Sequence, residues 1–200
     1  MQLLKETPPT MIKLGIVQFF SWFALFMMWV YTTSGIAGNV WHTAATDSTS
    51  AAFNEAGNWV GVIFAAYSLF AAIYAMFMTK LANKFGRKSV YMWSLMLGGI
   101  GLLSMVFIHD KYLLLISMLG IGIAWAAILA MPYAILSAVL PADKMGVYMG
   151  IFNATITIPQ IAAGILGGVI LSLVGGQAIV MLGVAGVSML LAGFSVRFVK

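Results

Sequence analysis

Charged residues are scarce in this chain, and cysteine is absent altogether. Only 8% of its 200 residues are Asp, Glu, Lys or Arg, whereas a soluble globular domain carries about 25%. So few charges cannot hydrate the surface of a soluble protein, and most of the exterior must therefore face lipid. The lack of cysteine excludes a disulfide framework, a thiolate metal site and a redox motif.

Apolar residues make up 62% of the chain, and its mean hydropathy is +1.04. They form six continuous runs, each long enough to cross a bilayer. Because backbone exposed to lipid must satisfy its own hydrogen bonds, we interpret the runs as helices. The sequence thus predicts an all-α integral membrane protein. The six predicted spans are 14–37, 59–78, 90–108, 112–140, 147–174 and 178–196.

The domain organisation follows from these spans. We expect a cytoplasmic N-terminal segment at residues 1–13 and one six-helix transmembrane domain at 14–200. An external loop is predicted at about 38–58 and a cytoplasmic basic turn at about 79–89. The N-terminal segment is polar and lacks a cleavage site, so it does not read as a signal peptide.

Basic residues gather on one side of the membrane if the six spans simply alternate. They are Lys5, Lys13, Lys80, Lys84, Arg87, Lys88, Lys144, Arg197 and Lys200. Only Lys111 falls on the other side. The positive-inside rule therefore predicts that both termini lie in the cytoplasm, in a multi-pass protein of the cytoplasmic (inner) membrane. This asymmetry also explains the net charge of +5 without a nucleic-acid partner.

The external loop carries His42, Asp47 and Glu55, which allows two interpretations. One is a metal or proton site, but the spacing matches no known ligand pattern. The other is a hydrated loop with some helical character, which we favour, and we predict no metal and no cofactor. The chain also lacks a metalloprotease helix motif, a nucleophile elbow and a phosphate loop. We therefore predict that the protein is not an enzyme.

The basic turn after the second span reads MTKLANKFGRK. It resembles the Gly-x-Leu-Ala-Asp-Arg-x-Gly-Arg-Lys signature of the major facilitator superfamily, with Gly86, Arg87 and Lys88 in place. Thr79 replaces the leading glycine and Asn83 the aspartate. In that family the acidic position anchors a conformational latch; a neutral Asn83 can cap a helix but cannot form the charged latch. The alternative interpretation is an unspecialised basic turn.

A second resemblance covers nearly the whole chain. It is to the sucrose–proton and glycoside–cation symporters of the same superfamily, and it maps onto their second six-helix half. Its motif residues are Gln18, Phe19, Phe20, Trp22, Phe23 and Ala24 in the first span, Trp125, Pro132, Tyr133 and Ser137 in the fourth, and Gly146, Gly150, Asn153, Ile156, Pro159 and Gln160 around the fifth.

This resemblance implies a half-domain built as a three-plus-three inverted repeat, with a sugar as substrate and a proton as the coupling ion. The coupling acid of such symporters lies in the first half. Accordingly, no Asp, Glu, Lys or Arg lies in the core of any predicted span here. We expect membrane lipid around the chain and, as partner, a second copy in a homodimer or a separate N-terminal half.

The first span carries a stripe of residues at helical spacing: Gln18, Trp22, Leu25, Trp29 and Thr32. An amide in hydrocarbon is costly, so the stripe is expected to face protein or a water-filled cavity. Sugars are bound by amides, hydroxyls and aromatic faces. We therefore predict that Gln18, Trp22 and Trp29 line a substrate pathway. Alternatively, the two tryptophans pack in the core or lie in an interfacial belt.

Asn153 and Thr157 form a second polar stripe in the fifth span, and Tyr133 lies in the fourth. We predict these three residues in the substrate pathway as well. For Asn153, a structural hydrogen bond and a substrate contact remain equally open. For Tyr133, interhelical hydrogen bonding is the favoured alternative.

Pro159, Gln160 and Gly164 are predicted to act structurally in the same span. The proline frees a backbone carbonyl near Thr155, which a buried amide could satisfy. For Gln160 a structural role is favoured over a substrate contact. The glycine permits close approach of a neighbouring helix.

Together these features predict secondary active transport of a sugar by symport, with the chain as half of a twelve-helix assembly. The alternative is a non-transporting product, either a truncated or split half-transporter or a small membrane scaffold.

Overall fold

The computed structural model describes residues 7–44 and 47–199, and within this part all regular secondary structure is helical, with no β-strand. Six helices are long and apolar enough to span a membrane, which confirms the predicted fold class. They are α2 (Pro9–Val40), α3 (Ala51–Phe85), α4 (Arg87–Phe107), α5 (Leu114–Leu136), α6 (Met145–Leu173) and α7 (Ala178–Ser195). Single 3₁₀ turns, η1 (Ala142–Lys144) and η2 (Val196–Phe198), follow α5 and α7.

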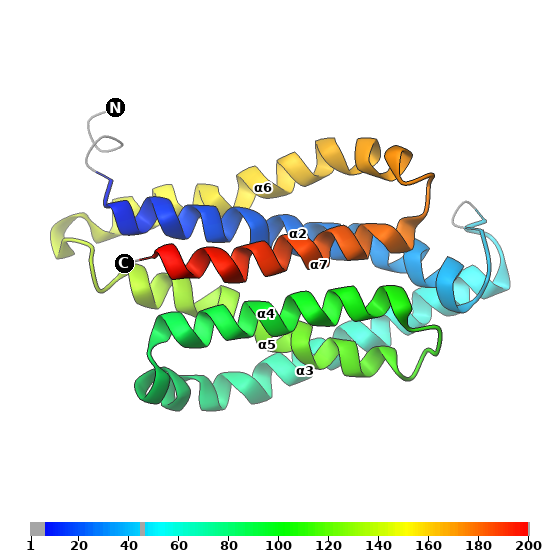
Figure 1. The fold of residues 1–200 in the computed structure, drawn as a ribbon, viewed down its shortest axis with the longest axis horizontal. Coiled ribbons are helices and arrows are strands. Elements are labelled where there is room, and N and C mark those ends of the chain that lie inside the picture. The colour runs from blue at the N-terminus through cyan, green and yellow to red at the C-terminus, as the bar shows by residue number, and fades with distance from the viewer. Residues whose placement is uncertain (1–6, 45–46, 200) are drawn as a thin grey trace.

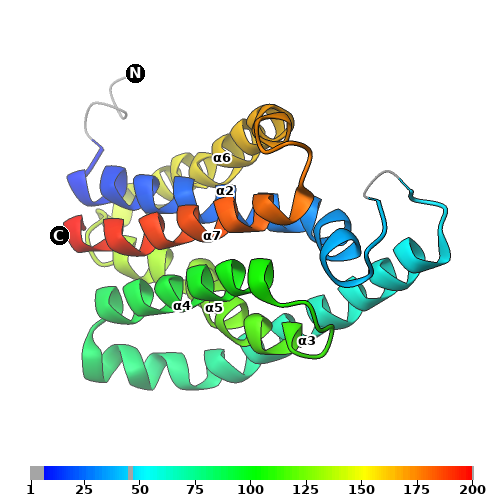
Figure 2. The ribbon, with the colours of Figure 1, turned by 45° about the vertical axis from the view of Figure 1, so that its right-hand side comes forward.

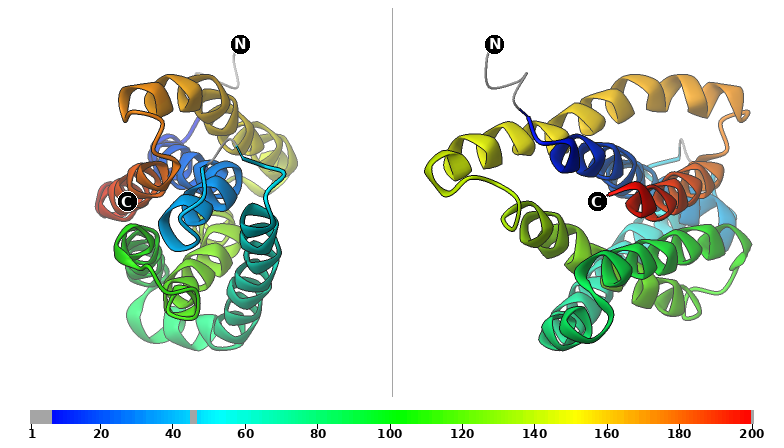
Figure 3. Two further views of the ribbon diagram at one scale, coloured as in Figure 1. Left: turned by 90° about the vertical axis from the view of Figure 1, so that its right-hand side faces the viewer. Right: turned by 60° about the vertical axis from the view of Figure 1, so that its left-hand side comes forward.

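The helices pack as one bundle in which α2 and α5 are central. α2 lies against α7 and α6, α5 lies against α4 and α3, and α4 packs on α7. Viewed along the bundle, α4 and α7 form one side while α3 and α6 flank the opposite side (Figures 1 and 3). This arrangement leaves α3 and α6 with little cover. Only 22% of the residues in the apolar stretch of α3 and 17% of those in α6 are buried, against 50% to 61% in the other helices.

The start of α2, the α3–α4 turn, η1 and η2 all lie at one end of the bundle (left in Figure 1). The described basic residues of the predicted cytoplasmic side belong to these segments, and Lys111 belongs to the loop at the opposite end. The alternation assumed for the positive-inside argument is therefore present. Lys5 and Lys200, which also entered that argument, lie outside the described residues.

Close helix packing in this bundle depends on glycine. A Cβ atom on Gly101 of α4 would lie 2.6 Å from the carbonyl oxygen of Ser117 in α5. A Cβ atom on Gly186 of α7 would lie 2.9 Å from the backbone nitrogen of Leu103 in α4. Without these side chains the backbones of α4, α5 and α7 approach each other directly, as small residues allow in membranes.

The helices extend beyond the predicted apolar runs. The loop expected at about 38–58 is reduced to 41–50, because α2 continues to Val40 and α3 begins at Ala51. The Ser50 hydroxyl caps α3 by accepting a hydrogen bond from the amide of Phe53 at 3.1 Å. Hydropathy marks only the lipid-embedded part of a helix, whereas a cap and polar helix formers prolong it into water. In Figure 2 the N-terminal end of α3 reaches past the α4–α5 loop.

The other two predicted connections are also partly helical. α2 begins at Pro9, inside the expected N-terminal segment 1–13, since proline is well tolerated in a first helical turn. In the basic turn only Gly86 is non-helical, and it separates α3 from α4 with a φ of 84°. That φ favours glycine, because a Cβ atom would be strained there.

Candidate functional site

An aromatic cluster joins three helices in the middle of the bundle. It consists of Trp22 and Trp29 of α2, Trp125 of α5 and Tyr67 of α3. The ring of Trp125 lies edge-on to the other three, with centroid distances of 5.9 Å to Trp22, 5.7 Å to Trp29 and 6.4 Å to Tyr67. Trp22 and Tyr67 are buried, while Trp29 and Trp125 are partly exposed. The cluster therefore presents aromatic surface at the junction of α2, α3 and α5.

Two buried hydrogen-bond donors, one within this cluster and one a helical turn before it on α2, lack an acceptor among the described residues. Gln18 is fully buried, and its Oε1 accepts a hydrogen bond of 3.2 Å from the Tyr91 hydroxyl of α4. Neither Gln18 Nε2 nor Trp22 Nε1 has a hydrogen-bond partner among the described residues. An unpaired buried donor costs about 1–3 kcal/mol. Such groups call for an explanation, and a bound acceptor oxygen is one.

Asn153 and Tyr133 connect α6 to α5. The Tyr133 hydroxyl donates a hydrogen bond of 2.8 Å to Asn153 Oδ1, and Tyr133 is half-buried. Asn153 and Thr157 are both exposed on α6. The side chains of Asn153 and Thr157 thus lie on a surface that this chain leaves uncovered, and contact of such polar groups with hydrocarbon is unfavourable.

The predicted structural residues of α6 occupy different environments. Pro159 is buried, whereas Gln160 is half-buried and has no hydrogen-bond partner in the described part of the chain. A Cβ atom on Gly164 would make only an ordinary contact of 3.9 Å with a ring of α2. The tighter approach occurs at Gly167, where a Cβ atom would lie 2.7 Å from the Tyr31 hydroxyl. Helical spacing alone does not tell which glycine meets a neighbouring helix, so the sequence predicts this contact at Gly164 and not at Gly167.

The cations of the basic turn bind the carboxyl ends of other helices. A guanidinium N–H of Arg87 donates to the carbonyl of Ala134 near the end of α5. Lys88 Nζ donates to the carbonyl of Val199 at 3.1 Å, just after η2. Both contacts place positive charge where helix dipoles are negative. Asn83 is exposed and has no side-chain hydrogen bond within the described residues, so the turn is held through its cations.

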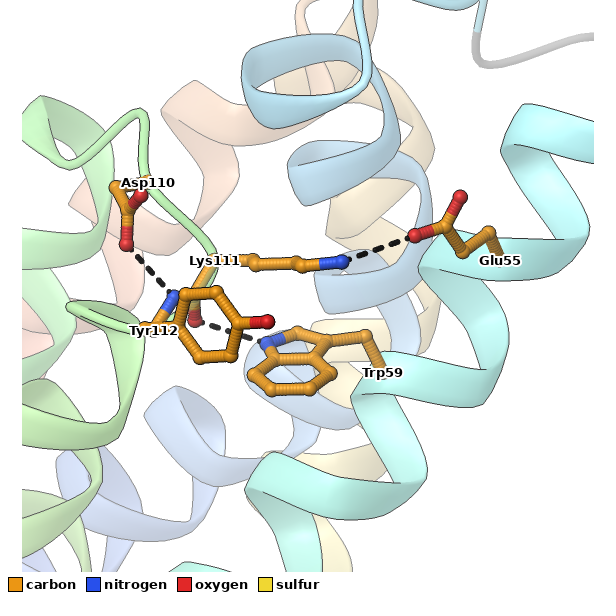
Figure 4. Close-up of polar contacts among 5 residues, drawn as sticks. All are labelled: Glu55, Trp59, Asp110, Lys111 and Tyr112. Atoms are coloured by element: carbon orange, nitrogen blue, oxygen red, sulfur yellow. Dashed lines mark hydrogen bonds and ion pairs between the residues drawn. The ribbon is translucent and has the colours of Figure 1, made fainter.

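At the opposite end of the bundle, Lys111 ties the α4–α5 loop to α3 (Figure 4). Its ammonium forms an ion pair of 3.1 Å with Glu55 and lies about 5.5 Å from the ring centroids of Trp59 and Tyr112. Trp59 Nε1 donates to the Lys111 carbonyl at 2.9 Å. The hydrogen bond with Glu55 raises the pKa of Lys111. Asp110 Oδ1 accepts hydrogen bonds from the backbone amides of Tyr112 and Leu113, just before α5.

A metal site in the external loop would need several histidine or carboxylate side chains close together. In residues 7–44 and 47–199 no three His, Asp or Glu side chains lie close enough together to hold a metal ion. Glu55 belongs to α3 and pairs with Lys111.

The sequence predicts that Gln18, Trp22 and Trp29 lie on one stripe of a helix, but it does not predict which residues of other helices contact them. Trp125 is a motif residue of the second resemblance, and neither it nor Tyr67 was predicted to line the substrate pathway. A tryptophan or tyrosine in the middle of a span, far from the interfacial belt, is the signal that could have identified both. Their convergence depends on how α3 and α5 cross α2, which no spacing along one helix encodes.

Comparison with known proteins assigns the chain to a family. No curated protein gives a significant match. The sequence model of the Major Facilitator Superfamily matches residues 14–200, which include all of α3 to α7 and most of α2. The match thus covers nearly the whole bundle, including the aromatic cluster and the basic turn. The chain belongs to the major facilitator superfamily, a family of membrane transporters.

Proposed function

We propose that the protein carries a sugar across the cytoplasmic membrane by secondary active transport, as one half of a twelve-helix assembly. The observation that carries the proposal is the pair of unpaired buried donors, Gln18 Nε2 and Trp22 Nε1, beside the aromatic cluster. Sugar hydroxyl oxygens accept hydrogen bonds, and the C–H face of a sugar ring packs on aromatic rings. Gln18 and Trp22 place both kinds of group on adjacent turns of α2, buried in this conformation.

The location of the site is consistent with a pathway between two halves. It lies on the central helices α2 and α5, on the side flanked by the poorly covered helices α3 and α6. The exposed amide of Asn153 and hydroxyl of Thr157 lie on α6. A second six-helix bundle over this side would shield them from lipid and enclose a polar route. That bundle is a second copy of the chain or a separate N-terminal half.

The coupling ion is proposed to be a proton bound outside this chain's spans. The predicted span cores contain no Asp, Glu, Lys or Arg, whereas ion-coupled transport needs an ionisable or ion-coordinating group in the membrane. The acid would belong to the partner half. The basic turn, with Asn83, Gly86, Arg87 and Lys88, would then act on the cytoplasmic side as a hinge between α3 and α4.

Binding and transport are measured separately, because half of a transporter can bind without transporting. The purified chain in nanodiscs is titrated with a panel of mono- and disaccharides while intrinsic tryptophan fluorescence is recorded. We expect saturable quenching by at least one sugar. The Gln18→Met variant, which removes the whole amide group and keeps the side-chain volume, is expected to bind at least about tenfold more weakly. A folded protein that responds to no sugar would contradict the proposal.

The same preparations test the alternative, a non-transporting half or membrane scaffold. The absence of a coupling charge in the span cores favours this alternative. Proteoliposomes containing the chain alone, and the chain with a candidate partner half, are assayed for proton-driven uptake of the bound sugar. Uptake in either preparation supports transport, while sugar binding without uptake in both would favour the non-transporting half.

A further inference from the structure

Two surface grooves meet at the cytoplasmic end of α4. The smaller, of about 180 Å³, lies between α4 and η2 and is lined by Lys88, Ser89, Met92, Val196, Arg197 and Val199. The larger, of about 540 Å³, lies between α3 and α4. Ser89 belongs to both linings, so the two grooves adjoin at this residue.

The smaller groove presents positive charge with unused hydrogen-bonding capacity. Lys88 donates one hydrogen bond, to the Val199 carbonyl, and an ammonium has three donors. The Arg197 guanidinium lies 5.3 Å from the centre of the Phe194 ring. No carboxylate pairs with either cation, and no group bonds the exposed Ser89 hydroxyl, in the part of the chain that the structure describes. The groove therefore suits an anion with several acceptor oxygens.

The larger groove is mostly apolar and extends along α4 from Ser89 to Leu97. Its lining includes Leu81, Phe85, Trp93 and Leu97. Trp93 is 61% exposed and lies one helical turn from Ser89 near the end of the span, a position where tryptophan is enriched between headgroups and hydrocarbon. An anion in the smaller groove would have a hydrocarbon-lined path directly beside it.

We propose that these adjoining grooves bind one anionic phospholipid. Its phosphodiester is held by Lys88, Ser89 and Arg197, and one acyl chain lies against Trp93 and Leu97 between α3 and α4. Charge complementarity selects this occupant: the predicted side is the cytoplasmic one, where the leaflet is rich in anionic lipid. The bound lipid would fasten η2 to the start of α4, beside the existing bond from Lys88 to Val199.

The test uses the full chain reconstituted in a mixture of phosphatidylglycerol and phosphatidylcholine, then extracted in mild detergent. Native mass spectrometry counts the lipids that stay bound. We expect one phosphatidylglycerol per chain, and about fivefold weaker retention in Arg197→Gln, the factor expected for one basic residue near an anionic headgroup. Arg197→Lys, which keeps the charge, is expected to retain the lipid. Lys144→Gln, which removes a basic residue of another turn on the same side, is the matched control.

A second readout follows the acyl chain. Phosphatidylglycerol with brominated chains is expected to quench Trp93, measured as the difference between the wild type and Trp93→Phe. Excess inorganic phosphate is expected to leave the lipid bound. The proposal would be overturned if phosphatidylcholine were retained equally well, if Arg197→Gln behaved like Lys144→Gln, or if inorganic phosphate displaced the lipid.

Discussion

The hydrogen bond between Tyr91 and Gln18 allows a quantitative test of the buried polar site. Tyr91→Phe removes the only donor to Gln18 Oε1 among the described residues and leaves that oxygen buried without a partner. An orphaned buried acceptor costs about 1–3 kcal/mol. The bond is 3.2 Å long, beyond the usual length of about 2.7–2.8 Å for two oxygens. We therefore expect the free energy of unfolding to fall by about 1–2 kcal/mol.

The same substitution should behave differently once the amide is gone. In a Gln18→Met background no acceptor remains to be orphaned, so Tyr91→Phe is expected to be neutral or stabilising. The double-mutant cycle should yield a coupling of about 1–2 kcal/mol, within the range found for residues in contact. Reversible unfolding with SDS in mixed micelles, followed by tryptophan fluorescence, measures all four proteins. If Tyr91→Phe cost the same in both backgrounds, the two side chains would not form this buried pair.

Three further predictions concern packing, charge and the basic turn. Gly101→Ala should lower the free energy of unfolding by about 1–3 kcal/mol through overpacking, whereas Gly61→Ala, where no atom lies within 4 Å, should not; equal effects in SDS titrations would contradict the glycine contacts. Because the pKa of Lys111 is raised, the stability that its ion pair with Glu55 contributes should be present below about pH 10.5 and be lost as the pH rises through the pKa of Lys111. The difference in melting temperature between wild type and Glu55→Gln should therefore shrink at alkaline pH, and a constant difference would argue against the pair. Arg87→Gln should accelerate amide exchange in the last turn of α5 about fivefold, the effect of losing one hydrogen bond of about 1 kcal/mol, and unchanged exchange there would refute the bond to α5.

The sequence predicted the six spans and their alternation because membrane burial imposes long apolar runs and an uneven distribution of lysine and arginine. It predicted less well where each helix ends. Residues 51–58 and Lys80 to Phe85 are polar, which predicts loops. In the structure the first segment is the beginning of α3 and the second is its end. Helix propensity and the Ser50 cap determine those ends, and hydropathy does not measure either.

The candidate site was predictable along single helices and not between them. The stripe through Gln18, Trp22 and Trp29 follows from spacing on α2 alone. The approach of Trp125 and Tyr67, and the bond from Tyr91 to Gln18, depend on how α3, α4 and α5 cross α2. Close approaches such as that of Gly122 in α5, where a Cβ atom would lie 2.5 Å from the Tyr67 carbonyl oxygen of α3, involve residues from different helices. A single sequence read helix by helix does not contain that information.

The central claim is that the side of the bundle flanked by α3 and α6 borders a polar pathway, and cysteine accessibility tests it most directly. Since the chain has no cysteine, Asn153→Cys and the control Leu97→Cys each introduce a single thiol near the same depth, on α6 and on the outer helix α4. In reconstituted vesicles with the partner half present, we predict that Asn153→Cys reacts with a membrane-impermeant methanethiosulfonate and is protected by the bound sugar, while Leu97→Cys does not react. Reaction of Asn153→Cys with lipid-soluble reagents alone would contradict the account.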